Sequence, residues 1–189
     1  MQCFSQSDST LRNLKVLKIS ALSFRVPYVG SSARVSYEYG ISEKITLEHE
    51  VGFNFYDSKG FMIRTDVKRY MNSGSNSNYW GIDLFYKNQN YTTSDSILDN
   101  YASYKVHKNV LALSLKYGEV KTFNFGLVID FYLGLGIRLI QNRNTLSTLE
   151  NSKMEATSDY GPNLIMNKAG SRLYPNILFG LKIGYKLNK

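Results

Sequence analysis

The chain has 189 residues, among them 15 tyrosines and 10 phenylalanines, and it carries a formal charge of +8. This length suits one domain, and the aromatic content favours half-buried pleated sheets. No apolar run approaches the roughly 18 residues of a membrane helix. The lysines and arginines are scattered singly, which argues against nucleic-acid binding and favours attraction to anionic lipid headgroups or lipopolysaccharide phosphates.

The first residues carry an incomplete export signature. Cys3 is the only cysteine, so it cannot form an internal disulfide. Cys3-Phe4-Ser5 has the small-x-small pattern of a signal-peptidase site, whereas the two residues before it fit a lipoprotein signal poorly. We predict that residues 1–13 are a signal-peptide remnant with a polar lead, and that residues 14–189 form one domain.

Alternation with a period of two predicts four strands in the first half of this domain. The first strand is ambiguous in register, because Val16 and Leu22 compete with Leu17 and Ile19 for its apolar face. The other three alternate cleanly and are joined by short turn-forming segments. The expected strands are 14–25, 33–41, 45–56 and 61–71.

Four more strands are predicted in the second half. Residues 88–103 and 141–172 are polar and lack a period of two, so we expect two long loops there. Gly118-Glu119 predicts a short turn between the sixth and seventh strands. The expected strands are 79–87, 104–117, 123–140 and 174–187.

The segment 123–140 has the clearest alternation. Its odd-numbered residues are all Phe, Leu or Ile, whereas its even-numbered residues include Asp130, Arg138 and several glycines. Strands of soluble domains usually run about 5–6 residues, but a tilted strand that crosses a bilayer needs roughly 9–11. The length and the uniform apolar face predict a membrane-spanning strand.

Together the eight strands predict an all-β fold, namely an eight-stranded antiparallel up-and-down transmembrane β-barrel. Eight is an even number and the smallest that is usual for such barrels. The connections after the second and sixth strands are short, and those after the fifth and seventh are long. If both termini are periplasmic, this matches short periplasmic turns and long external loops. We expect a multi-pass location in the outer membrane of a Gram-negative envelope.

The apolar face allows two interpretations. A soluble lipocalin-like barrel would turn it inward, but the bulky residues of eight strands would overcrowd so narrow a lumen. The opposite face is rich in glycine and in charges of both signs, which can neutralise one another inside. Arg34, Glu38, Lys68 and Lys182 belong to that face. We predict a barrel-interior polar network that contains Glu48, Glu50, Arg64, Asp66, Asp83, Lys87, Asp130 and Arg138.

Several short motifs follow one another along residues 15–187. They are Lys-Ile-Ser-Ala-Leu (18–22), Val-Ser-Tyr-Glu-Tyr (35–39), Arg-Tyr-Met (69–71), Trp-Gly-Ile-Asp (80–83), Tyr-Leu-Gly-Leu-Gly-Ile-Arg (132–138) and Pro-Asn-Ile-Leu-Phe-Gly-Leu-Lys-Ile-Gly-Tyr-Lys-Leu (175–187). In this order they resemble small Bacteroidota-type outer-membrane β-barrel proteins. The resemblance implies an outer-membrane location and no established activity. The chain end departs from the pattern, because Tyr185 is followed by Leu187-Asn188-Lys189 rather than by a terminal aromatic residue.

Few residues have the types and spacing that catalysis needs. His49 and His107 are the only histidines, and no serine lies two residues from His49 on its apolar face. We expect a tolerated neutral imidazole at His49 and a residue near a strand end at His107. Glu48 and Glu50 are spaced to share a cation, but pairing with interior arginines is the simpler expectation. We predict no enzyme activity, no cofactor and no metal site.

The predicted function is that of a non-enzymatic, structural outer-membrane barrel. It would serve as an anchor or in protein–protein interaction, including as an accessory subunit of an envelope complex. The expected partners are outer-membrane lipid or lipopolysaccharide, and envelope proteins that bind the loops 88–103 and 141–172. The alternatives are a narrow channel or small-solute porin, a lipid-modifying barrel enzyme that uses His49, and a soluble lipocalin-like binding barrel.

Overall fold

The computed structural model describes residues 11–22, 32–54, 58–72, 76–97, 100–150 and 167–187. The signal-peptidase site predicted at Cys3-Phe4-Ser5 lies outside these residues. Within the part that the structure describes, no helix is long and apolar enough to cross a membrane.

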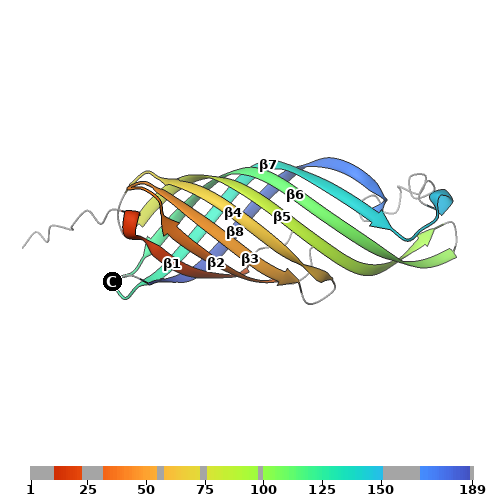
Figure 1. The fold of residues 1–189 in the computed structure, drawn as a ribbon, viewed down its shortest axis with the longest axis horizontal. Helices are drawn as coiled ribbons and strands as arrows, with labels where there is room; N and C mark the ends of the chain where they lie inside the picture. Colours follow the sequence, from red (N-terminus) through yellow and green to blue (C-terminus); the bar gives the residue numbers. More distant parts are fainter. Residues whose placement is uncertain are drawn as a thin grey trace, which may run out of the picture.

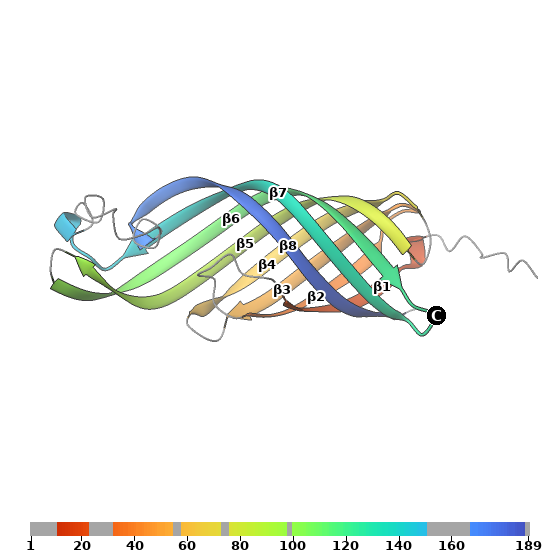
Figure 2. The same ribbon diagram turned by 180° about the vertical axis from the view of Figure 1, so that it is seen from behind.

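Eight strands form one closed antiparallel barrel (Figures 1 and 2). Each strand pairs with the next in sequence, and β8 pairs with β1 to close the ring. The all-β, eight-stranded antiparallel barrel predicted from the sequence is therefore confirmed. The elements are the 3-10 helix η1 (Leu11–Asn13) and the strands β1 (Lys15–Leu22), β2 (Ser32–Gly40), β3 (Ile45–Asn54), β4 (Lys59–Tyr70), β5 (Asn76–Ile97), β6 (Asn100–Thr122), β7 (Leu127–Asn144) and β8 (Gly170–Lys186).

The two faces of the sheet differ in polarity within the barrel. On β6, Leu115 is 65% exposed on the outer surface, whereas the next residue, Lys116, is fully buried inside. On β1, Leu17 and Ile19 face outward and Lys18 faces inward, which resolves the register that the sequence left open. The outward-facing apolar residues form a surface that we call the apolar belt. It comprises Leu17, Ile19, Val35, Val51, Phe53, Phe61, Ile63, Val67, Trp80, Ile82, Leu84, Tyr86, Leu111, Leu113, Leu115, Phe131, Leu133, Leu135, Ile137, Leu173, Ile177, Phe179 and Ile183.

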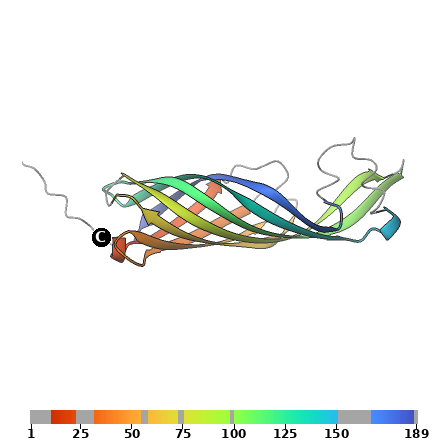
Figure 3. The same ribbon diagram turned by 90° about the horizontal axis from the view of Figure 1, so that it is seen from above.

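The β5–β6 hairpin is longer than the sequence predicts. The two strands stay paired as far as Ile97↔Asn100, so the loop predicted at 88–103 is wrong and nearly all of it is strand. β4 stops pairing with β5 at Asn90, and the hairpin continues past the ends of β1–β4 (Figures 1 and 3). We call its outer part, residues 91–104, the arm. The alternation was invisible in the sequence because residues 91–104 are largely polar in composition, so backbone pairing of β5 with β6 rather than an apolar pattern defines the arm.

The loop predicted at 141–172 also contains strand at both ends. β7 continues to Asn144, and β8 begins at Gly170, whose φ of 122° lies in the left-handed region. Two amides of β7 hold the end of the connection. Asn142 Nδ2 donates to the carbonyl of Lys168 at 3.3 Å, and Asn144 Nδ2 donates to the carbonyl of Asn167 at 3.2 Å.

The turn between β6 and β7 lies later in the chain than predicted. Gly118 and Glu119 belong to β6, and residues 123–126 form the turn, in which Gly126 has a φ of 96°. β7 therefore begins at Leu127 rather than at residue 123. A Cβ atom at Gly118 would lie 2.4 Å from Cζ of Tyr79, so this glycine makes room for an aromatic ring inside the barrel. No local sequence pattern relates Gly118 to Tyr79, so the position of this ring could not be predicted.

A cluster of buried apolar and tyrosine side chains, which we call the apolar layer, lies inside the barrel and reaches the end where η1 and the C-terminus lie (Figure 1). Leu11 and Leu14 pack against the buried residues of this layer, so residues 11–13 belong with the barrel rather than with a separate lead. A Cβ atom at Gly40 would lie 1.7 Å from the carbonyl oxygen of Leu11, and only glycine lets η1 approach so closely. The buried members are Val16, Tyr70, Tyr79, Val120, Val128, Tyr132 and Leu178.

Candidate functional site

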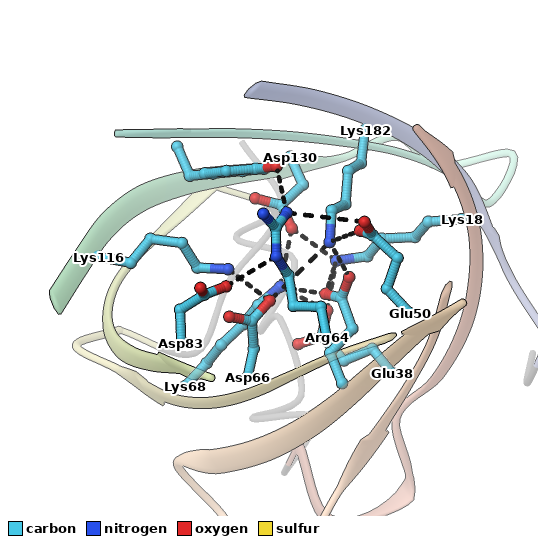
Figure 4. Close-up of polar contacts among 12 residues, drawn as sticks. Lys18, Glu38, Glu50, Arg64, Asp66, Lys68, Asp83, Lys116, Asp130 and Lys182 are labelled. Carbon is cyan, nitrogen blue, oxygen red and sulfur yellow. Dashed lines mark hydrogen bonds and ion pairs between the residues drawn. The ribbon is translucent and has the colours of Figure 1, made fainter. Parts of the chain in front are cut away.

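The candidate functional site is a charge network in the middle of the barrel (Figure 4). Every second residue of a strand faces the lumen, and each of the eight strands contributes at least one charged side chain to the network. Six are cationic and six are anionic, so the network is neutral overall. The members are Lys18, Arg34, Arg64, Lys68, Lys116 and Lys182 with Glu38, Glu48, Glu50, Asp66, Asp83 and Asp130.

Two lysines share the same three carboxylates at the centre of the network. Lys18 Nζ lies 3.1 Å from Glu48 Oε2 and 2.7 Å from Asp130 Oδ2, and it also pairs with Glu38. Lys68 Nζ lies 3.0 Å from Glu38, 2.5 Å from Glu48 and 2.8 Å from Asp130. These three carboxylates offer oxygens within 4.8 Å of one another, a spacing that would suit a metal ion. Two ammonium groups already occupy that position and supply the positive charge.

Lys182 and Lys116 connect this centre to a second group of acids. Lys182 Nζ pairs with Glu48, lies 2.6 Å from Glu50 Oε2 and lies 3.9 Å from Asp66 Oδ2. Lys116 Nζ lies 2.5 Å from the same Asp66 oxygen. Because Lys182 comes from β8 and its acids come from β3 and β4, these pairs cross the lumen.

Two arginines form the part of the network farthest from η1. Arg64 Nε lies 2.9 Å from Asp83 Oδ2, and its Nη1 donates to the Tyr132 hydroxyl at 3.1 Å. Glu50 lies 3.6 Å from Nη1 of both Arg34 and Arg64. With these pairs, every carboxylate of the network has at least one cationic partner.

Tyrosine side chains complete the network on the side of the apolar layer. The Tyr70 hydroxyl donates to Glu38 and the Tyr79 hydroxyl donates to Asp130, each at 2.8 Å. Lys68 Nζ lies 4.7 Å from the centre of the Tyr79 ring, a cation–π distance. The buried acids thus accept hydrogen bonds from hydroxyl groups as well as from ammonium groups, which offsets their loss of hydration.

The structure brings most of the sequence-predicted residues together. Glu48, Glu50, Arg64, Asp66, Asp83 and Asp130 all belong to the network. The other two predicted members, Lys87 and Arg138, also face the interior but lie farther from η1. Arg138 places its guanidinium 5.8 Å from the centre of the Tyr174 ring.

Sequence reasoning missed two lysines of the network. Lys18 was hidden by the ambiguous register of the first strand. Lys116 follows Leu111, Leu113 and Leu115 in strict alternation, and this alternation was the signal that would have placed it inside.

Both histidines lie outside the barrel. His49 is exposed on the outer surface, where its Nδ1 lies 3.1 Å from the Thr65 hydroxyl and its ring lies 6.2 Å from that of Tyr39. His107 contacts asparagine side chains on β5 and β6. Among the described residues, neither histidine has the carboxylate that would orient a catalytic base.

These features define a closed eight-stranded barrel with an apolar exterior and a neutralised charge network in its interior. The chain matches no protein-family model, no curated protein and no solved structure. The resemblance to small outer-membrane barrel proteins therefore stays a prediction. The arrangement itself is suited to holding eight strands together, since its acids and bases are consumed in pairing with one another.

Proposed function

We propose that this protein is a non-enzymatic outer-membrane β-barrel that anchors the arm at the membrane surface. The observation that carries the proposal is the inverted distribution of polarity, with Leu, Ile, Val and Phe exposed on the outside and Lys, Arg, Glu and Asp buried inside. Such an exterior is unfavourable in water, where contiguous exposed apolar patches are rare. It suits hydrocarbon, and the ring is closed by pairing of β1 with β8, where Val16–Leu22 face Leu181–Lys186.

The barrel interior supports an anchor rather than a pore. An eight-stranded barrel is only wide enough for side chains or one small ligand. Here the charge network occupies the middle, and the apolar layer with Leu11 and Leu14 occupies the η1 end. We therefore expect no measurable conductance in planar bilayers, and ion conduction by the purified barrel would favour the narrow-channel alternative.

The arm supports a role in interaction. It extends beyond β1–β4 as a paired hairpin, and its root carries the buried residues Tyr104 and Val106, against which Tyr91 and Leu146 pack. An ordered root holds the arm in a fixed direction relative to the barrel, which suits presentation of a surface to an envelope protein.

Membrane fractionation tests the proposal directly. We expect the protein in the membrane pellet after carbonate and high-salt washes, and in the soluble fraction only after detergent is added. As a control for aggregation, folded barrel in detergent should resist trypsin while heated barrel is digested. Recovery of folded, monodisperse protein in detergent-free buffer would contradict the proposal and support a soluble barrel.

A further inference from the structure

A polar patch lies on the outer surface of β4–β7, directly beyond the apolar belt. Its central row consists of Lys59, Asn90, His107 and Arg143, which are consecutive partners across four strands. Partners in register point to the same face, with Cβ atoms about 4.5–5.5 Å apart. With the outward-facing neighbours of this row, the set forms what we call the collar patch: Lys59, Asn88, Asn90, Lys105, His107, Asn109 and Arg143.

The amides and the imidazole of the collar patch are already held in place by one another. His107 Nδ1 donates to Asn90 Oδ1 at 2.5 Å, and its Nε2 accepts from Asn88 Nδ2 at 3.4 Å, which fits the tautomer protonated at Nδ1. Asn88 Nδ2 also donates to Asn109 Oδ1 at 2.8 Å. These bonds preorganise the polar groups, so little side-chain entropy is lost when a ligand binds there.

The cations of the collar patch have no acidic partner in the described ranges. Lys59, Lys105 and Arg143 are exposed, and no ion pair joins any of them to a described carboxylate. In the interior of the same barrel each network carboxylate is paired with a cation. The cations of the collar patch, in contrast, are not neutralised by described acids. Arginine and lysine in such a setting bind phosphate oxygens through charge-assisted hydrogen bonds.

The apolar belt begins immediately below the collar patch. The row next toward the belt centre contains Tyr86, Leu111 and Leu139, again partners in register on the outward face. The Tyr86 hydroxyl donates to Asn109 Oδ1 at 3.2 Å and so joins the belt to the patch. A ligand that contacts both rows must be apolar at one end and anionic at the other.

We propose that the collar patch binds the headgroup of a phosphorylated glycolipid, a proposal that rests on the membrane location argued above. Lys59, Lys105 and Arg143 contact the phosphate, and the amides of Asn88 and Asn90 hydrogen-bond to sugar hydroxyls. The acyl chains lie against the belt below. Free phosphate would use only the cations and would gain nothing from the adjoining apolar row.

Native mass spectrometry in a neutral detergent tests this inference. Wild-type barrel is mixed with phosphorylated lipid A, with dephosphorylated lipid A, with phosphatidylglycerol, or with phosphorylated lipid A in the presence of inorganic phosphate. The test variant is K59Q/K105Q/R143Q. The control variant, K44Q/R69Q/K121Q, removes the same charge from exposed residues toward the η1 end of the barrel.

We expect retention of phosphorylated lipid A to weaken about tenfold or more in the test variant and to stay within about twofold in the control. Dephosphorylated lipid A and phosphatidylglycerol should both bind more weakly than phosphorylated lipid A. Unchanged retention in the test variant, or an equal loss in the control, would overturn the site. Equal binding of phosphatidylglycerol would refute the claim that the patch recognises sugar hydroxyls. Displacement by millimolar phosphate would refute the claim that the ligand is a lipid.

Insertion into neutral phosphatidylcholine vesicles separates this inference from the proposed function. A barrel that inserts and becomes protease-resistant, yet shows no preference among the lipids, refutes only the collar patch. A folded barrel that does not insert refutes the membrane location and the collar patch together.

Discussion

At the scale of single residues, Glu48 is the acid of the network that pairs with three lysines. It contacts Lys18, Lys68 and Lys182, which come from three different strands. Because an ammonium group buried without its counter-ion is costly, the loss of one acid affects all three lysines. The stability of the network therefore depends strongly on Glu48. In the sequence this residue is not distinguished from the other polar positions of an alternating strand.

We expect Glu48→Gln to lower the free energy of unfolding by about 3–5 kcal/mol, because it leaves buried ammonium groups under-neutralised. Urea unfolding in detergent, followed by tryptophan fluorescence, measures the change. Glu119→Gln, at an exposed position of β6, serves as the control and should change stability by less than about 0.5 kcal/mol. Equal unfolding midpoints for the two variants would show that the network does not contribute to stability.

Gly118 provides a second prediction at this scale. Gly118→Ala places a methyl group against the Tyr79 ring, whose hydroxyl donates to Asp130, and should destabilise the barrel by about 1–3 kcal/mol. In a Tyr79→Ser background the same substitution should cost much less, because the ring is gone. A double-mutant cycle in the same urea assay measures this coupling. Additive effects of the two substitutions would contradict the packing described here.

At the scale of elements, a strand could be located from the sequence when its two faces differ in polarity. β3 and β7 were located from the sequence because their outward residues are mostly apolar and their inward residues include charged side chains and glycines. The arm was missed because its sequence is largely polar. Its strands are defined by backbone pairing between β5 and β6, which the local sequence pattern does not reveal. Lys18 shows the same limit, since the register of β1 is decided by its contacts with β2 and β8.

The register of the arm can be tested by cross-linking. In a Cys3→Ser background, the pair Thr92→Cys and Lys105→Cys should form a disulfide rapidly, because these residues face each other across β5 and β6. The pair Thr92→Cys and Ser103→Cys is the control, since its Cα atoms lie on a diagonal of about 7–8 Å. The shift on non-reducing gels reports both. Similar cross-linking of the two pairs would indicate a flexible loop instead of a paired hairpin.

At the scale of the whole molecule, the fluorescence of Trp80 can report whether the outer face of the barrel contacts lipid. It is the only tryptophan of the chain, it is 55% exposed on the belt, and its ring centre lies 5.0 Å from that of Tyr117. In vesicles of brominated phosphatidylcholine we expect strong quenching of its fluorescence, because the ring contacts the lipid.

The matched variant moves the single tryptophan across the wall of the barrel. Trp80→Phe combined with Phe85→Trp places it on the inward face of β5, near Arg64, where bromine atoms cannot reach it. Quenching should then fall to a small fraction of the wild-type value. Equal quenching of the two proteins would contradict the proposal that the outer face of the barrel contacts lipid and the inner face does not.

The ion pairs across the lumen constrain how the barrel is assembled. Lys18 on β1 meets Asp130 on β7, and Lys182 on β8 meets Glu48 on β3, so neither pair exists until the sheet has curled into a ring. An open sheet entering hydrocarbon would carry these groups without their partners, at a cost of several kcal/mol for each ion. For the membrane barrel proposed above, we therefore expect insertion and ring closure to occur in one concerted step. A partly closed barrel with these charges unpaired would be unstable in hydrocarbon, so under the proposed function we expect no stable, leaky intermediate.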